Sequence, residues 1–121
     1  MRRPLSPHLQ IYRLPLTAWL SITHRITGVV LGFGLIGLVG FVLALAGDGT
    51  AYTAMQRGLQ SPVGRLLLFL WLLALFLHFC HGIRHLLWDL VWGFERERLA
   101  CHSVIELIAA LGLTGLSWLW I

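Results

Sequence analysis

The chain carries the stretch ITGVVLGFGLIGLVGFVLALAG at residues 26–47, a run of 22 residues without a formal charge. A helix rises 1.5 Å per residue, so this run is about 33 Å long and spans the roughly 30 Å hydrocarbon core of a bilayer. Gly47, Asp48 and Gly49 end it with turn-forming residues. The sequence therefore predicts a first transmembrane helix over about residues 22–47.

Two further apolar segments follow. Residues 66–83 contain 18 positions interrupted only by two histidines, and Ser61-Pro62 precedes them as a helix start. The last segment, from about Ser103, carries tryptophans near its end that suit a membrane interface. We expect transmembrane helices over about 62–92 and 101–121, with 48–65 as a connecting loop. The predicted fold class is all-α: one membrane-anchor domain over residues 1–121, with three transmembrane helices and a short N-terminal inner-side segment.

Composition excludes a water-soluble domain. Of the 121 residues, 58% are hydrophobic and 12% are charged, whereas soluble domains average about 25% charged residues. The nine basic residues are all arginines and lie at the ends of apolar stretches, not along one face, which argues against nucleic-acid binding. Cys80 and Cys101 are far apart and are interpreted as small apolar residues.

The arginines also predict the orientation. Seven fall on the side of the N-terminal segment and the second loop, and two fall opposite. Because cytoplasmic loops are enriched in basic residues, the N-terminus is expected inside and the C-terminus outside. Residues 1–20 show no apolar run before a cleavage site, so no signal or transit peptide is expected. The inner set is Arg2, Arg3, Arg13, Arg25, Arg84, Arg96 and Arg98, and the outer set is Arg57 and Arg65.

Ionisable residues gather at one end of the first two spans. Such groups are costly in a membrane and are functional candidates by default. On the second span, a helical wheel places His78, His85 and Asp89 within about 20° of one another, His81 about 60° away and Arg84 in another sector. His24 and Arg25 open the first span. The pattern predicts one polar site embedded in the membrane.

Imidazoles at mid-depth beside arginines suit a b-type haem with its propionates toward the polar end. His78 is the deepest histidine and the best axial candidate. His85 lies seven residues away, about 10.5 Å along the helix, which is too far for a second ligand to the same iron. We expect His24 one or two turns shallower than His78, so the other ligand is expected from a second polypeptide. Histidines satisfied by hydrogen bonds within the protein are the alternative.

The first and third spans each carry one further feature. Ser21, Arg25, Gly28 and Gly32 align on one face of the first span, where the glycines allow a helix or a flat group to approach closely. Glu106 is expected to be partly solvated near a helix N-terminus, where the helix dipole favours a negative charge, and is assigned no role.

Two motifs resemble one known family. They are RPLSPHLQIY at residues 3–12 with SITHRITG at 21–28, and HFCHGIRHLLWD at 78–89. Their order and spacing are similar to the two signatures of the cytochrome b556 subunits of succinate dehydrogenase, the larger membrane anchors of respiratory complex II. The resemblance covers the chain apart from the 48–65 loop and the third span. His81 departs from it, since many members have an apolar residue there, and His81 is kept as a competing ligand.

The resemblance implies a role in succinate:ubiquinone oxidoreductase, with no succinate oxidation by this chain alone. Expected partners are a flavoprotein, an iron–sulfur subunit, a smaller anchor and the lipid bilayer, in a bacterial inner membrane. Expected cofactors are haem b, shared with the smaller anchor, and ubiquinone as substrate. His78 corresponds to the haem iron ligand, Ser21 and Arg25 to the quinone site, and His24, Arg25 and His85 to the polar site at the propionates.

Two other function classes remain open from the sequence. One is a structural membrane anchor without redox chemistry, whose histidines are satisfied in helix packing. The other is a small transporter or channel subunit that uses the buried charges as a proton path. The second is weaker because the charges are confined to the first two spans.

Overall fold

The computed structural model describes residues 13–93 and 95–121 and is all-helical over them. Three helices are long and apolar enough to cross a membrane, which confirms the predicted fold class of an all-α protein with three transmembrane helices. A fourth, shorter helix joins the first two. The helices are α1 (Leu16–Ala46), α2 (Gly49–Gln60), α3 (Pro62–Asp89) and α4 (Arg96–Trp118).

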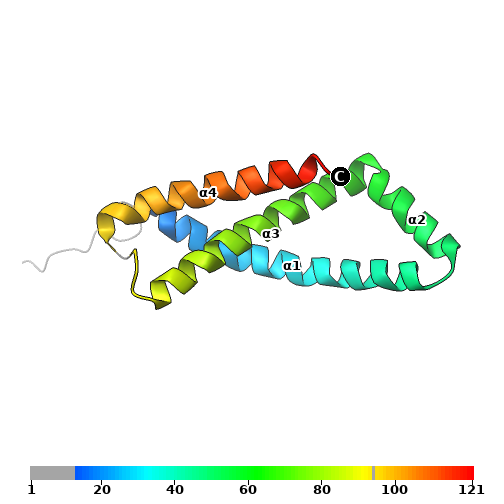
Figure 1. Ribbon diagram of the computed structural model, residues 1–121, viewed down its shortest axis with the longest axis horizontal. Coiled ribbons are helices and arrows are strands. Elements are labelled where there is room, and N and C mark those ends of the chain that lie inside the picture. The colour runs from blue at the N-terminus through cyan, green and yellow to red at the C-terminus, as the bar shows by residue number, and fades with distance from the viewer. Residues whose placement is uncertain (1–12, 94) are drawn as a thin grey trace, which may run out of the picture.

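The three long helices form a bundle in which α3 is central. Figure 1 shows α3 running between α1 and α4, with the start of α1, the end of α3 and the start of α4 at the same end of the molecule. We call this end the polar end, because the ionisable side chains of the spans gather there. Helix α3 contacts both neighbours extensively, and α1 touches α4 over a smaller area.

Large apolar side chains face outward and small ones face the helix contacts. Phe33, Ile36 and Leu43 on α1 are 67–71% exposed, whereas Ala74 on α3 and Ala110 on α4 are buried. Lipid solvates apolar side chains, so helices in membranes associate through close packing of small residues rather than through burial of large ones. The distribution is that of a protein whose surface is solvated by lipid.

The helix limits differ from the expected spans at the polar end. Helix α1 begins at Leu16 and α4 at Arg96, six and five residues before the expected starts at 22 and 101. Helix α3 ends at Asp89, because the backbone then turns through positive φ angles of 57° at Val91 and 82° at Gly93. The limits of the bilayer itself stay a prediction.

Helix α2 occupies part of the region that was expected to be a loop. Asp48 caps it by accepting a hydrogen bond from the Ala51 amide (3.2 Å). Hydrogen bonds from the Thr50 side chain and the backbone hold the pKa of Asp48 below its ordinary value. The prediction of a loop was therefore wrong over this helix. The length of an apolar run identifies only helices that can span a bilayer, and a 12-residue helix is too short for that criterion.

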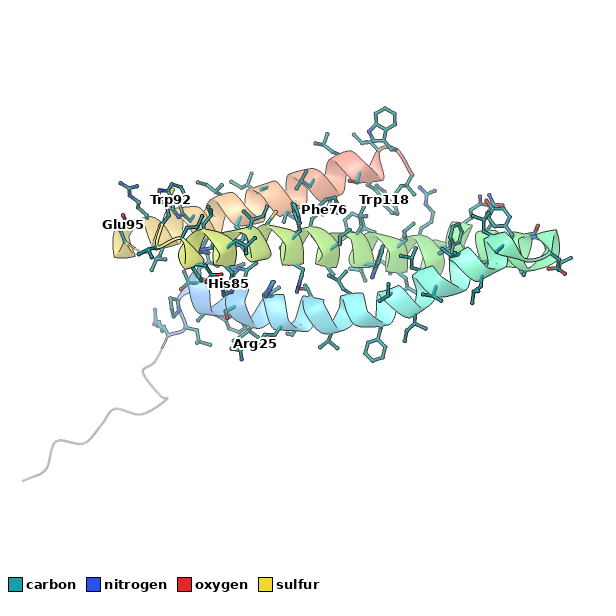
Figure 2. The ribbon with its side chains drawn as sticks, turned by 60° about the horizontal axis from the view of Figure 1, so that its bottom comes forward. Arg25, Phe76, His85, Trp92, Glu95 and Trp118 are labelled. Carbon is teal, nitrogen blue, oxygen red and sulfur yellow. The ribbon has the colours of Figure 1, made fainter. Side chains whose placement is uncertain are left out.

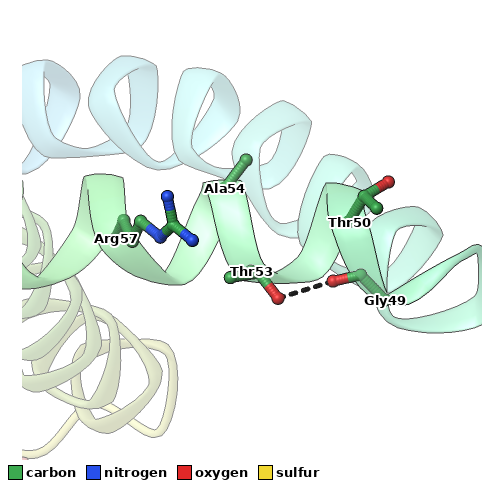
Figure 3. A pocket seen from close by; sticks show the side chains of 5 residues that line it. All are labelled: Gly49, Thr50, Thr53, Ala54 and Arg57. Atoms are coloured by element: carbon green, nitrogen blue, oxygen red, sulfur yellow. Dashed lines mark hydrogen bonds between the residues drawn. The ribbon is translucent and has the colours of Figure 1, made fainter.

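Helix α2 packs by one face against α1. The ring centres of Tyr52 and Phe41 lie 6.0 Å apart. The terminal methyl of Met55 lies against Gly40, since a Cβ built there would be 3.7 Å from it. The hydroxyl of Thr53 donates to the Gly49 carbonyl (2.6 Å). An open cavity of about 420 Å³ lies along the helix (Figure 3), lined by Gly49, Thr50, Thr53, Ala54 and Arg57.

A single glycine permits the close approach of α1 and α3 near mid-span. A Cβ at Gly34 would overlap with Nε1 of Trp71. The indole ring is rigid, so we expect Gly34→Ala to destabilise the bundle by about 1–3 kcal/mol through overpacking. Gly37→Ala is the matched control, because nothing lies within 4 Å of a Cβ there. Thermal unfolding of the purified protein in detergent measures the difference, and equal melting temperatures for the two variants would contradict this packing.

Candidate functional site

Four histidine rings from α1 and α3 meet at the polar end. The rings of His24 and His78 are stacked with their centres 3.9 Å apart and their planes 12° apart. His81 lies 4.9 Å from His24 and also 4.9 Å from His85. In Figure 2 His85 extends from α3 toward α1. The structure thus brings together all the histidines that the sequence proposed for the polar site.

Helix α1 holds one edge of the His78 ring. Nδ1 of His78 lies 3.1 Å from the backbone carbonyl oxygen of His24 and 3.3 Å from the Thr27 hydroxyl. A Cβ at Gly28 would lie 3.2 Å from Cε1 of the same ring, so the absence of a side chain there admits the imidazole. His78 is half-buried.

The expected depth of His24 was wrong. We expected it one or two turns shallower than His78, yet the two rings are stacked. Since α1 begins at Leu16, His24 lies about 12 Å inside its helix, and His78 lies about 16 Å from the end of α3. The two residues are therefore at similar depths.

Buried polar groups connect α3 to α4 beside the histidines. Nδ1 of His81 donates to Oε1 of Glu106 (2.7 Å), and Nη1 of Arg84 donates to Oε2 of the same carboxylate (3.1 Å). Arg84 also donates to the Ser103 hydroxyl (2.8 Å) and to the Leu99 carbonyl (3.0 Å). Its guanidinium lies 4.7 Å from the centre of the Trp88 ring. Each charge thus has an opposite partner, as buried charges require.

The expectation of a partly solvated Glu106 was also wrong. Its exposure is 6%, and that of His81 is 1%. Because α4 begins at Arg96, Glu106 lies about 15 Å into the helix, on the face turned to α3. Nδ1 of the His81 ring points to this carboxylate. Its Nε2 is buried and has no hydrogen-bond partner within residues 13–93 and 95–121.

The quinone candidates lie apart from the histidines. Arg25 is exposed, and Figure 2 shows it on the side of α1 away from α3. Ser21 precedes it by four residues, one helical turn, and is half-buried. Both Gly28 and Gly32 were expected to allow a close approach. Gly28 does so, because a Cβ there would lie 3.2 Å from the His78 ring. Around Gly32 no described atom lies within 4 Å of such a Cβ. Asp89, expected in the histidine sector, is exposed.

Sequence reasoning missed three residues of the site. Thr27 contacts His78, and Ser103 and Glu106 bind Arg84. A signal was available for Thr27, which follows His24 by three residues and so shares its helix face. For Glu106 the signal was its isolation, since it is the sole acidic residue after Glu97. Residues 3–12 of the first motif lie outside the described part of the chain.

Comparisons with known proteins show which family the chain belongs to. The family model for the transmembrane subunits of succinate dehydrogenase and fumarate reductase matches residues 1–117. The chain belongs to this family. It is therefore a multi-pass membrane subunit of an enzyme complex, and the resemblance seen in the two motifs is confirmed.

Individual relatives extend the match over nearly the whole chain. A succinate dehydrogenase cytochrome b556 subunit of Rickettsia felis is 34% identical over 117 residues, covering 97% of this chain and 91% of the relative. The protein of the same name in Paracoccus denitrificans is 40% identical over 96 residues, covering 79% and 74%. A cytochrome b560 subunit of Reclinomonas americana is 36% identical over 125 residues, covering 98% and 86%. The transmembrane-subunit family thus accounts for all three long helices.

Proposed function

We propose that this chain is the cytochrome b anchor of a succinate:ubiquinone oxidoreductase. It holds haem b at its interface with a second, smaller anchor subunit and forms part of the quinone-reduction site. The observation that carries the proposal is the hydrogen bond at Nδ1 of His78, which prepares the other ring nitrogen to bind iron. The names of the relatives, which are cytochrome b subunits of succinate dehydrogenase, support it.

The tautomer of His78 follows from its partner. A backbone carbonyl only accepts hydrogen bonds, so Nδ1, which lies 3.1 Å from the His24 carbonyl oxygen, carries the proton. Nε2 then has the lone pair. Imidazoles that bind metals characteristically donate their other N–H to a carbonyl or carboxylate in this way. A haem bound here would supply one-electron transfer between the partner subunits and the quinone.

A second nitrogen ligand for the haem iron would come from another chain. His24 and His78 are stacked face to face at 3.9 Å between ring centres, which leaves no space for an iron between the two rings. His81 is 1% exposed and its Nε2 is enclosed by protein. His85 lies seven residues, about 10.5 Å along the helix, from His78, which is too far for the same iron. The family resemblance implies that a histidine of the smaller anchor would fill this role.

The polar residues around His78 suit the haem propionates. Nδ1 of His24 is buried and has no hydrogen-bond partner among the described residues, and buried polar groups rarely stay unpaired. A propionate oxygen would accept its proton. Arg25 was also expected at the propionates, but it faces away from α3 and is exposed, so the structure does not bring it to the histidines. His85 lies 5.6 Å from the His24 ring. His24 and His85 would therefore bind the two carboxylates.

Ser21 and Arg25 would bind the quinone on the other side of α1. Reduction places negative charge on the quinone oxygens, and a hydroxyl donor with a fixed cation one turn later stabilises that charge. Their outward position means that a partner subunit must complete the pocket, which fits a site formed between subunits. The neighbouring iron–sulfur subunit would deliver the electrons and the flavoprotein would oxidise succinate.

A bacterial inner membrane fits the relatives from Rickettsia felis and Paracoccus denitrificans. Seven arginines on the side of the N-terminal segment, against two on the other side, support an orientation with the polar end at the cytoplasmic face. In this orientation the C-terminus is periplasmic. The haem and the quinone would then lie near the side on which the soluble subunits assemble.

The test uses membranes that contain this chain together with its partner subunits. We expect Arg25→Leu and Ser21→Ala each to lower succinate-dependent quinone reduction by about tenfold or more, because each removes a group that stabilises developing charge. The b-type absorption band, recorded in the same samples as a reduced-minus-oxidised spectrum, should persist in Ser21→Ala. Arg57→Leu, on α2 at the opposite end, is the control and should retain full activity.

Two outcomes would contradict the proposal. Full activity in assembled Arg25→Leu and Ser21→Ala complexes would remove the quinone site from these residues. An assembled wild-type complex without any b-type band would leave this chain a structural anchor that tethers the soluble subunits.

A further inference from the structure

We propose that Thr27 is a positioning residue that fixes the orientation and the donor strength of the His78 imidazole. This inference rests on the proposed role of His78 as an iron ligand. It concerns a residue that neither the helical pattern nor the motif assigned to the site.

Thr27, His24 and His78 form a closed triangle of hydrogen-bonding atoms. The Thr27 hydroxyl donates to the His24 carbonyl oxygen (2.9 Å). Nδ1 of His78 lies 3.1 Å from that same oxygen and 3.3 Å from the hydroxyl oxygen. Since the hydroxyl proton is directed to the carbonyl, the lone pairs of the hydroxyl face Nδ1. The N–H of His78 is therefore shared between two acceptors, both supplied by α1.

Burial makes this arrangement effective. Thr27 is 6% exposed, one of two buried residues on α1. Water is therefore a poor competitor for its hydroxyl. With the His24 ring stacked on one face of His78 and Gly28 against its Cε1 edge, the imidazole is held on several sides. The Thr27 hydroxyl restricts the remaining freedom, rotation of the ring in its own plane and about its bond to Cβ.

Acceptors at Nδ1 also change the chemistry of the opposite nitrogen. A hydrogen bond from the ring N–H makes the metal-binding nitrogen more basic, and partners of this kind commonly change metal affinity by about 10- to 100-fold. A more basic ligand stabilises the oxidised, more positively charged iron. Loss of the Thr27 hydroxyl should therefore weaken haem binding and raise the midpoint potential of the haem.

The experiment compares three variants in the complete complex, purified in detergent. Thr27→Val keeps the shape of the side chain and removes the hydroxyl, and Thr27→Ser keeps the hydroxyl. Thr23→Val is the matched control, because the Thr23 hydroxyl bonds only within its own helix, to the Trp19 carbonyl (2.9 Å). The readouts are the midpoint potential by redox titration and the haem-to-protein ratio after dilution.

We expect Thr27→Val to have a higher midpoint potential and about tenfold or more weaker haem retention, with Thr27→Ser and Thr23→Val close to wild type. A Thr27→Val complex that matches wild type in both readouts would overturn the positioning role. The same holds if Thr27→Ser behaves like Thr27→Val, because packing rather than the hydroxyl would then be responsible.

The variant His78→Ala shows whether the role of Thr27 or the proposed iron ligand is at fault. Loss of haem in His78→Ala together with a wild-type Thr27→Val overturns only the role of Thr27. Retention of the haem band in His78→Ala overturns the assignment of the ligand, and the role of Thr27 is overturned with it.

Discussion

Replacing His78 by alanine is expected to abolish the b-type absorption band of the assembled complex almost completely. The substitution removes the imidazole whose Nδ1 is anchored by the His24 carbonyl (3.1 Å) and whose Nε2 we propose as the iron ligand. His81, one helical turn away, is not placed to replace it, because it is enclosed at 1% exposure and its Nδ1 is engaged by Glu106. A dithionite-reduced-minus-oxidised spectrum of membranes with all subunits measures the band.

The matched variant is His81→Ala, one helical turn away on the same helix. The b-type band of this variant should persist, because the His81 ring bonds to Glu106 and so contacts α4. A band lost in His81→Ala and kept in His78→Ala would move the ligand by one turn and contradict the assignment. Co-purification of the soluble subunits checks that each variant assembles.

The second large effect is expected at Glu106. Glu106→Leu leaves Arg84, which is 5% exposed, without its ionic partner inside the bundle. Removing one member of a buried pair costs about 3–5 kcal/mol, because the other charge stays buried and uncompensated. We therefore expect a large fall in the thermal stability of the complex in detergent. Glu95→Gln, at the exposed residue before α4, should leave the melting temperature unchanged.

A double variant separates the uncompensated charge from lost packing. Arg84→Met with Glu106→Leu removes both charges and keeps apolar volume, so it should be more stable than Glu106→Leu alone. Glu106→Gln should fall between wild type and Glu106→Leu, since an amide still accepts hydrogen bonds. A double variant less stable than Glu106→Leu would show that the interaction between the two residues is not the source of the effect.

The features that the sequence predicted are those set by local composition. Residues 26–47 contain no charge and must be solvated by lipid wherever their neighbours lie. The face that carries His78 and His85 follows from the helical period alone, and so does the different sector of Arg84, which the structure directs to α4. The two motifs identified the family because their residues and spacing are read directly from the chain.

Contacts between helices were decided only by the tertiary structure. The stacking of His24 on His78 and the burial of Glu106 depend on how α1 and α4 are aligned along and around α3. A shift of one residue in that alignment moves a side chain by 1.5 Å along the helix axis and turns it by 100°. Hydropathy does not fix the alignment, because an apolar helix can slide or rotate against its neighbour without any change in composition. The sequence alone therefore determined that the ionisable residues of the first two spans share one end. The packing of α1 and α4 on α3 decided which side chains touch, and it added Thr27, Ser103 and Glu106 to the site.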